Sequence, residues 1–424
     1  SFLKSGGRAM LSMSIILIVF FITLVIAILS GLVFLIPSVP IKYIKIHLYL
    51  IVLPIIVSVI GLLNVSDREQ IGPFTMDHLA WLMGSFILIL DFIIQKFSVR
   101  YLIGDRNYRK YFPLFTLITS FASIAWLSGD LRLMVLFWGA TLLSLTLLIR
   151  VNRSWKIPYE AAKVSGKSFA LGWLSLLVAV ILLYVATGNW HINVTLANDD
   201  VITSGMRFII DMLIVLAVVV PAAQFPFQSW LIESVAAPTP VSAIMHAGIV
   251  NAGGIILTRF SPVFNDPLAI TILLIIASIS VLLGSGISLV HVDYKRQLVG
   301  STMSQMGFML VQCALGVYSA AIIHLILHGV FKATLFLQSG SVVKRFNIPT
   351  PPSAKRSYSW VVLGRCLAII IAILFWLGSD RSAYEILSAL ILAWSLMVSW
   401  NQMVAFSRGL IGRVIGIIMI VIVA

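Results

Sequence analysis

Long runs of apolar residues recur from end to end of this 424-residue chain and constrain its fold more than any other feature. A run of about 17–25 such residues spans the hydrocarbon core of a bilayer, about 30 Å, as a helix. Hydrophobic residues make up 60% of the chain and charged residues only 10%, whereas a soluble domain has roughly half and a quarter. The sequence therefore predicts an all-α polytopic membrane protein.

The apolar runs predict about fourteen membrane-spanning helices. They lie near residues 11–36, 43–64, 78–97, 111–128, 131–150, 168–186, 206–234, 239–260, 267–290, 297–317, 319–343, 360–378, 383–406 and 409–424. The first run is too long for the apolar region of a signal peptide and has no small-residue cleavage site, so no cleavable signal is expected.

Lysine and arginine gather in alternate loops between these runs. The basic set holds Lys42, Lys45, Arg100, Arg106, Arg109, Lys110, Arg150, Arg153, Lys156, Lys163, Lys167, Lys295, Arg296, Lys344, Arg345, Lys355 and Arg356. The positive-inside rule places this set in the cytoplasm and the amino terminus outside, although Lys4 and Arg8 oppose that orientation. These loops are either topology determinants alone or also a landing surface for a cytoplasmic partner.

The net charge of +14 does not indicate nucleic-acid binding, because the charges lie in short loops with no soluble domain to carry a phosphate-binding face. The two cysteines, Cys313 and Cys366, lie in apolar runs and make neither a disulfide framework nor a metal site. The expected environment is the lipid bilayer.

Several ionisable residues lie within or at the ends of the predicted spans, where a charge is costly and usually faces a bundle interior or a water-filled path. The candidates for an ion pathway are Asp91, Glu233, His246, Asp293, Lys295, His324, His328 and Lys332. Asp91 and Glu233 are equally compatible with relay ends and with helix struts.

His324, His328 and Lys332 follow one another at a spacing of four residues, which places all three on one helix face. At 1.5 Å per residue they cover roughly 12 Å of membrane depth. Histidine exchanges protons near neutral pH, so this row favours a proton relay over transport of a bulky solute. The alternative is that the histidines are hydrogen-bonded struts between helices. No carboxylate or cysteine accompanies them, so no metal site is predicted.

Four prolines fall within 20 residues, in "VVVPAAQFPFQSWL" and "APTPVSAIMH": Pro221, Pro226, Pro238 and Pro240. Proline removes a backbone donor and breaks a helix, and a break at membrane depth is tolerated only where protein or a water-filled cavity covers it. The sequence thus predicts a broken helix with His246 facing a polar pocket, or a helix-end kink without one.

The stretch "QFPFQSWLIESVAAPTPVSAIMHAGIVNAGGIIL" resembles the signature of the antiporter-like membrane subunits of respiratory complex I and of multisubunit cation/proton antiporters. The later stretches "KRQLVGSTMSQMGFML" and "AAIIHLILHGVFKATLFLQSGSVV" resemble the family's next conserved block. The resemblance implies two inverted five-helix repeats with broken helices and a polar axis at the membrane midplane. It places His246, His324, His328 and Lys332 on or near that axis, and Lys295 and Arg296 at a helix entrance.

On this basis the chain divides into four parts. They are N-terminal helices over 1–110, a first repeat over 111–260, a second over 261–406 and a C-terminal helix over 407–424.

Three departures separate this chain from the usual family pattern. Gly139 stands where a fifth-span glutamate is expected, Pro221 where its partner lysine is expected, and Arg365 is no obvious substitute for the twelfth-span lysine. Losing both members of a pair avoids leaving one buried charge alone. The fifth-span sequence "WGATLLSLTLL" resembles instead a divergent branch, the DabB-type membrane subunit of two-component inorganic carbon transporters.

That second resemblance implies a large cytoplasmic partner, a zinc protein similar to β-carbonic anhydrases (DabA-type), which would hydrate CO2 to bicarbonate. This chain would conduct H+ or Na+ and hold no cofactor, since the zinc chemistry would belong to the partner. Two alternatives stay open, a subunit of a cation/proton antiporter or complex I-like pump, and a membrane anchor that conducts nothing. The driving ion, the carbon species handled and the stoichiometry are left open by the sequence.

Overall fold

The computed structural model describes residues 12–65, 68–152, 156–197, 201–339, 358–378 and 383–400. The chain forms two compact units that divide between Val343 and Lys344. In the described ranges the only strands are β1 (Glu69–Ile71) and β2 (Phe74–Met76), an antiparallel hairpin that turns at Gly72 with a φ of +58°. The remaining regular structure is helical, as the apolar runs predicted.

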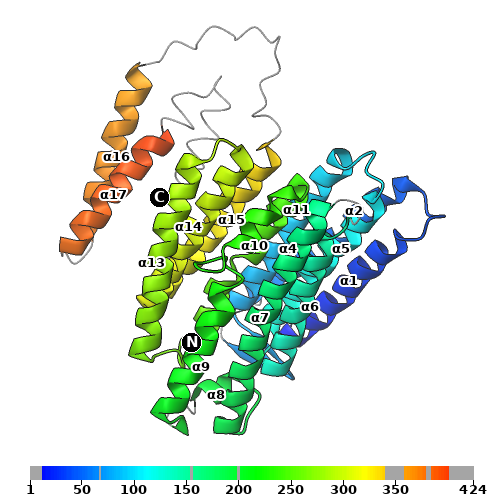
Figure 1. The fold of residues 1–424 in the computed structure, drawn as a ribbon, viewed down its shortest axis with the longest axis horizontal. Helices are drawn as coiled ribbons and strands as arrows, with labels where there is room; N and C mark the ends of the chain where they lie inside the picture. The colour runs from blue at the N-terminus through cyan, green and yellow to red at the C-terminus, as the bar shows by residue number, and fades with distance from the viewer. Residues whose placement is uncertain are drawn as a thin grey trace, which may run out of the picture. The chain divides into compact units, whose positions relative to one another are not determined.

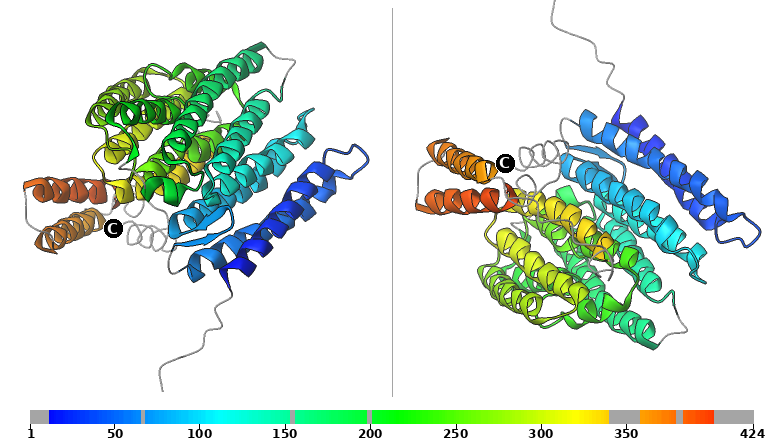
Figure 2. Two further views of the ribbon diagram at one scale, coloured as in Figure 1. Left: turned by 90° about the horizontal axis from the view of Figure 1, so that it is seen from below. Right: turned by 90° about the horizontal axis from the view of Figure 1, so that it is seen from above.

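The first unit is built almost entirely from helices. They are α1 (Met13–Val33), η1 (Ile41–Tyr43), α2 (Ile44–Leu50), α3 (Val52–Asn64), α4 (His78–Tyr101), α5 (Tyr108–Leu127), α6 (Leu131–Ile149), α7 (Lys156–Thr187), α8 (Ile192–Ala197), α9 (Ser204–Val219), α10 (Ser229–Glu233), η3 (Ser234–Ala236), α11 (Thr239–Ile244), η4 (Met245–Ile249), α12 (Ala252–Phe260), α13 (Pro267–Val290), α14 (Tyr294–Ala314) and α15 (Tyr318–Leu337). In Figure 1 the long helices run alongside one another, with α1 at one edge of this unit and α13 at the opposite edge. Figure 2 shows the same order from two further directions.

The second unit contains α16 (Tyr358–Gly378) and α17 (Ala383–Trp400). The indole of Trp400 packs onto Gly364 of α16 and donates a hydrogen bond to the Trp360 carbonyl at 2.7 Å. Arg365, which lies beside this contact in sequence, is exposed.

Ten helices of the described chain are long and apolar enough to cross a membrane, and they match ten of the predicted spans. Of the other four, the span 206–234 is a helix that breaks after Val219, and 297–317 corresponds to α14, which is more polar. The span 383–406 is described only to Trp400 as α17, and 409–424 lies outside the described residues.

One expectation about the loops is wrong. The prediction places Lys156, Lys163 and Lys167 in a loop, but all three lie on α7, which begins at Lys156 and runs for 32 residues. Six further basic residues of the predicted loops lie in the first or last turn of a helix: Lys45, Arg100, Arg109, Lys110, Lys295 and Arg296. With its 32 residues, α7 is about 48 Å long and outreaches a hydrocarbon core of about 30 Å. Its first turns therefore extend beyond the core, where exposed lysines are favourable.

Aspartates start four of the long helices. Asp77, Asp130, Asp266 and Asp293 each accept a backbone N–H of the first turn that follows, at distances from 2.8 to 3.0 Å. The carboxylate satisfies an amide that has no partner within the helix and complements the positive end of the helix dipole. These residues set where α4, α6, α13 and α14 begin.

Two glycines let α13 and α14 approach closely. A Cβ at Gly300 would lie 2.7 Å from the backbone nitrogen of Ser288, and one at Gly307 would lie 2.8 Å from the carbonyl oxygen of Ala277. Small residues at membrane-helix interfaces permit this backbone contact, which dispersion forces stabilise. The pairing holds α14 in place beside α15, which carries the histidine and lysine row.

Candidate functional site

The predicted row of polar residues lies on one face of α15 and becomes more buried along the helix. His324 is half-buried, His328 is 5% exposed and Lys332 is fully buried. The His324 Nδ1 atom lies 3.1 Å from Gln312 Oε1 on α14, and the rings of His324 and His328 meet edge to face with centroids 6.1 Å apart. The structure therefore brings all three together as the spacing predicts.

The Lys332 ammonium group is held by the backbone of α14. Its Nζ donates a hydrogen bond to the Leu298 carbonyl at 3.0 Å, and no carboxylate among the described residues pairs with it. A buried cation without a counter-charge is costly. The site therefore favours a side chain that can give up its proton over one that stays permanently charged.

His246 extends this row from a different helix. It lies in η4, a π-helical segment between α11 and α12, and its ring stacks on Phe336, with centroids 4.4 Å apart and planes 15° apart. Phe336 is one helical turn beyond Lys332, so His246 lies at the lysine end of the row. Single π-helical turns inside α-helices occur frequently at functional sites.

The ring nitrogens of His246 and His328 have no hydrogen-bond partner among the described residues, although both residues are buried. Buried polar atoms are nearly always paired with protein or ordered water. A strut between helices would use these nitrogens, whereas a proton relay keeps them available to water and to a mobile proton.

The proline-rich stretch does break the helix. After α9 ends, the chain runs without regular structure through Pro221 and Pro226 to α10, and Pro238 and Pro240 begin α11. Ala223 in this segment has a φ of +54°, in the left-handed region that costs a non-glycine residue about 1 kcal/mol or more. The Gln224 side chain donates to the carbonyls of Ala222 and Met303, which satisfies part of the freed backbone.

Lys295 lies at the first turn of α14, where its Nζ donates to the Ala237 carbonyl at 3.3 Å. Glu233 is exposed, and Asp293 caps the same helix end. Glu233 and Asp293 line a surface cleft of about 600 Å³ together with Lys156, Glu160 and Arg296. The structure thus places these two acids at a surface cleft near the start of α14 rather than within the row.

Asp91 lies midway along α4, 2% exposed, in a cluster of its own with Gln95. Where α4 packs on the row's helices, Phe86 lies against Gly329, and Ile87 and Leu90 lie against Gly248. The structure does not join Asp91 to the row by a hydrogen bond within the described residues.

Trp173 occupies the space beside Gly139. Its indole Nε1 donates to the Val135 carbonyl at 2.8 Å, and a Cβ added at Gly139 would collide with the same nitrogen. Pro221 in turn packs on Gly172, where an added Cβ would lie 3.0 Å from Pro221 Cδ. The two positions where the resemblance expects a charge pair are therefore filled by an indole and a proline ring.

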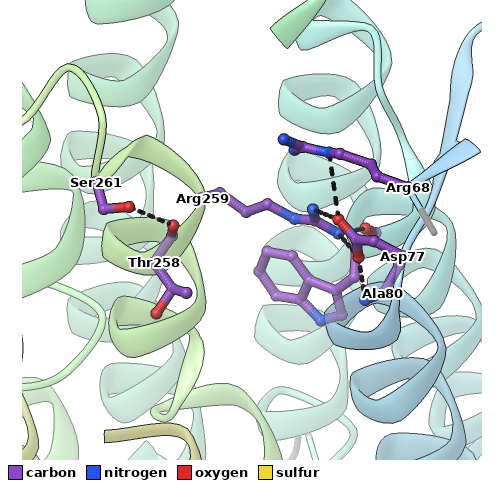
Figure 3. Close-up of polar contacts among 7 residues, drawn as sticks. Arg68, Asp77, Ala80, Thr258, Arg259 and Ser261 are labelled. Carbon is purple, nitrogen blue, oxygen red and sulfur yellow. Dashed lines mark hydrogen bonds and ion pairs between the residues drawn. The ribbon is translucent and has the colours of Figure 1, made fainter. Parts of the chain in front are cut away.

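Sequence reasoning missed several buried ionisable residues, namely His47 of α2, Asp211 of α9 and Arg259 of α12. Figure 3 shows the Arg259 guanidinium reaching Asp77 at the start of α4, where both terminal nitrogens meet the two carboxylate oxygens. It also donates to the Trp126 carbonyl at 3.0 Å, and Arg68 lies 3.6 Å from the same carboxylate. An arginine inside the predicted span 239–260 was a signal for such a pair.

The described ranges hold no group of three or more histidine, cysteine or acidic residues placed to bind a metal ion.

Residues 128–416 match the profile of a family described as the transmembrane part of NADH:quinone oxidoreductase and the Mrp antiporter. The chain belongs to this family. It is an antiporter-like, multi-pass membrane subunit, which confirms the resemblance drawn from the quoted motifs.

Two bacterial relatives are identical to it at more than half of the aligned positions. One is 59% identical over 96% of this chain and 81% of its own length, the other 55% over 97% and 81%. They are named probable inorganic carbon transporter subunit DabB, from Bacillus subtilis (strain 168) and Bacillus anthracis. The fold is similar to that of a chain in the membrane-bound sulfane sulfur reductase, an archaeal respiratory membrane complex, with a TM-score of 0.71, 18% identity and coverage of 97% of this chain and 93% of that one.

Proposed function

We propose that this chain conducts protons as the membrane subunit of an inorganic carbon uptake complex in the bacterial cell membrane. The observation that carries the proposal is the buried row on α15, in which His328 and Lys332 lie one turn apart and the His328 ring nitrogens are unpaired. Histidine and a desolvated lysine bind and release protons near neutral pH, and ionisable residues within membrane spans usually mark ion or proton pathways.

The burial of the row's members indicates the order in which they would carry a proton. His324 is half-buried and hydrogen-bonded to Gln312, which supports a role as an entry group. Successive α15 residues at four-residue spacing then span about 12 Å, a distance that ordered water bridges between side chains can complete. Lys332 and His246 form the far end, toward the loops rich in lysine and arginine that we assign to the cytoplasm, with the amino terminus outside.

The proposed link to inorganic carbon rests on the relatives, which are named as subunits of inorganic carbon transporters. Hydration of CO2 releases a proton, so coupling that step to proton flow keeps it in one direction. We assign the hydration to a large cytoplasmic zinc-binding partner of the β-carbonic-anhydrase type, since zinc activates water for attack on carbon. This chain would then supply the proton path and the docking surface.

The partner is tested by gentle purification of the chain from its own membrane. The expected result is one large soluble protein that co-purifies and carries about one zinc per copy. Recovery of several small membrane subunits without zinc would instead favour the second candidate, a cation/proton antiporter or complex I-like subunit, which the matched family also contains.

The relay is tested by carbon uptake in cells that carry His328→Gln or Lys332→Gln. We expect both variants to abolish uptake while the complex still assembles. The control is His291→Gln, a histidine at the end of α13 outside the row. Uptake at the wild-type rate in either row variant would contradict the relay and favour a membrane anchor.

A further inference from the structure

A second buried polar cluster lies in the N-terminal helices, before the first residue of the family match at position 128. It joins Ser30 of α1, His47 of α2, Asp91 and Gln95 of α4, and Thr116 of α5. None of these residues is more than 4% exposed. The cluster holds two groups that can bind a proton, His47 and Asp91.

The Gln95 amide lies at the centre of the cluster. Its Nε2 donates to Asp91 Oδ2 and to Thr116 Oγ1, each at 2.9 Å, so both amide hydrogens are used. Its Oε1 lies 3.1 Å from His47 Nε2, and a side-chain amide oxygen is only an acceptor. The His47 nitrogen that faces Gln95 must therefore carry a hydrogen.

The other side of the His47 ring also faces an acceptor. Its Nδ1 lies 2.7 Å from Ser30 Oγ, whose own hydrogen is directed to the Ala27 carbonyl at 2.7 Å. Thr116 Oγ1, 3.3 Å from His47 Nε2, likewise donates to the Phe112 carbonyl at 3.1 Å. A neutral imidazole has one N–H, yet this arrangement offers acceptors to both ring nitrogens.

The Asp91 carboxyl group meets a similar shortage of donors. One oxygen accepts from Gln95, while Oδ1 is buried and receives no hydrogen bond from the described residues. The neighbouring Thr119 hydroxyl donates instead to the carbonyls of Phe115 and Thr116. A proton on Oδ1 would have this hydroxyl oxygen as its acceptor, whereas a carboxylate there gains a donor only when the Thr119 hydroxyl turns away from those carbonyls.

No fixed cation balances the carboxyl group. The three ion pairs among the described residues involve Asp77 and Asp130, not Asp91. Lys332, His328 and His246 belong to α15 and η4, which also pack on α4; there Phe86 lies against Gly329, and Ile87 and Leu90 lie against Gly248. His47 is the one titratable side chain of the described residues that connects to Asp91 by hydrogen bonds, through Gln95.

We propose that His47 and Asp91, joined by Gln95, form a second proton-binding site, separate from the row on α15. The cluster presents more acceptors than donors, so an added proton completes its hydrogen bonds. When that proton leaves, the Ser30 hydroxyl turns from the Ala27 carbonyl to His47 Nδ1 and restores the pairing. Ser30 lies within one turn of the end of α1, and His47 within one turn of the start of α2. The site therefore lies about one turn from the connection between these helices, which carries Lys42, while Lys45 lies in the first turn of α2.

Infrared difference spectroscopy tests the site without a transport assay. Spectra of the full chain in lipid, recorded between two pH values, report the C=O stretching band of each carboxyl group that gains a proton. We expect one such band to disappear in Asp91→Asn, which keeps an acceptor for Gln95. Asp266→Asn, at the exposed start of α13, is the matched control and should leave that band in place.

Histidine ring ¹⁵N resonances give the second measurement. His47→Gln identifies the His47 signals, which should change between the one-proton and two-proton forms over the same pH interval as the Asp91 band. Ser30→Ala removes the acceptor that faces His47 Nδ1. The pH interval over which both signals change should then shift by a factor of ten or more in proton concentration. A His47 signal and an Asp91 band that both stay constant with pH would show a fixed structural network and overturn the proposal.

Discussion

Arg259 and Asp77, 182 residues apart in sequence, form a two-pronged ion pair that ties α12 to the start of α4. The arginine side chain is 6% exposed and the aspartate 17%, so the pair is largely removed from water. Asp77 also caps α4 through the Ala80 amide, and Arg259 reaches the Trp126 carbonyl near the end of α5. One contact thus fixes three helices at the same end of the unit.

Replacement of Arg259 by Met is expected to destabilise the protein by about 3 kcal/mol, because it leaves a mostly buried carboxylate without its partner. The free energy of unfolding in mixed micelles measures this. Arg68→Met is the matched control, since Arg68 contacts the same carboxylate at 3.6 Å but is 44% exposed, and its loss should cost less than about 1 kcal/mol. Equal effects of the two variants would contradict the assignment.

Gly139→Ala is expected to destabilise the protein by about 1–3 kcal/mol, because its new methyl group meets the Trp173 indole. Gly205→Ala, a helix glycine with nothing within 4 Å of an added Cβ, should change the stability by less than about 0.5 kcal/mol. Thermal unfolding of both variants in lipid tests this. If Gly139→Ala is as stable as the control, Trp173 does not occupy that space.

The variant Lys332→Arg distinguishes two roles for this residue, a fixed positive charge and a group that carries a proton. Arginine keeps a positive charge and can donate to the Leu298 carbonyl, but it does not release its proton in proteins. We therefore expect carbon uptake to fall to the level of cells without the protein, with assembly of the complex unchanged. Wild-type uptake would mean that Lys332 acts only as a fixed charge.

The stability of the α5–α6 connection should depend on pH through Asp130. Burial raises the pKa of Asp130, but the hydrogen bonds from the Arg132 side chain and backbone outweigh it and leave the pKa below its ordinary value. The unfolded chain then takes up a proton at a higher pH than the folded chain does. The stabilisation is complete above about pH 4 and is lost as the pH falls through the lower folded value.

The measurement for Asp130 is the difference in Tm between the wild type and Asp130→Asn. Asparagine keeps the cap of α6 but has no charge for Arg132. The difference should be largest near pH 7 and should shrink as the pH falls below about 4 and through the lower pKa of the folded chain. A difference that stays constant across this interval would show that the carboxylate charge contributes nothing.

The fold class and most of the spans could be predicted from the sequence, because membrane insertion is a local property of about 20 consecutive residues. Even the broken helix followed from Pro221 and Pro226, since proline acts on its own backbone. The first turns of α7 could not be placed this way, because Lys163 and Lys167 lie on helical backbone that continues beyond the apolar run.

The candidate site divides in the same manner. Spacing alone put His324, His328 and Lys332 on one face of a helix, since a helix repeats every 3.6 residues. The sequence did not determine that His246 stacks on Phe336, that His47 joins Asp91 through Gln95, or that Arg259 finds Asp77. Those contacts cross helices far apart in the chain, so only the packing of the helices, which brings distant surfaces within hydrogen-bond distance, decided them.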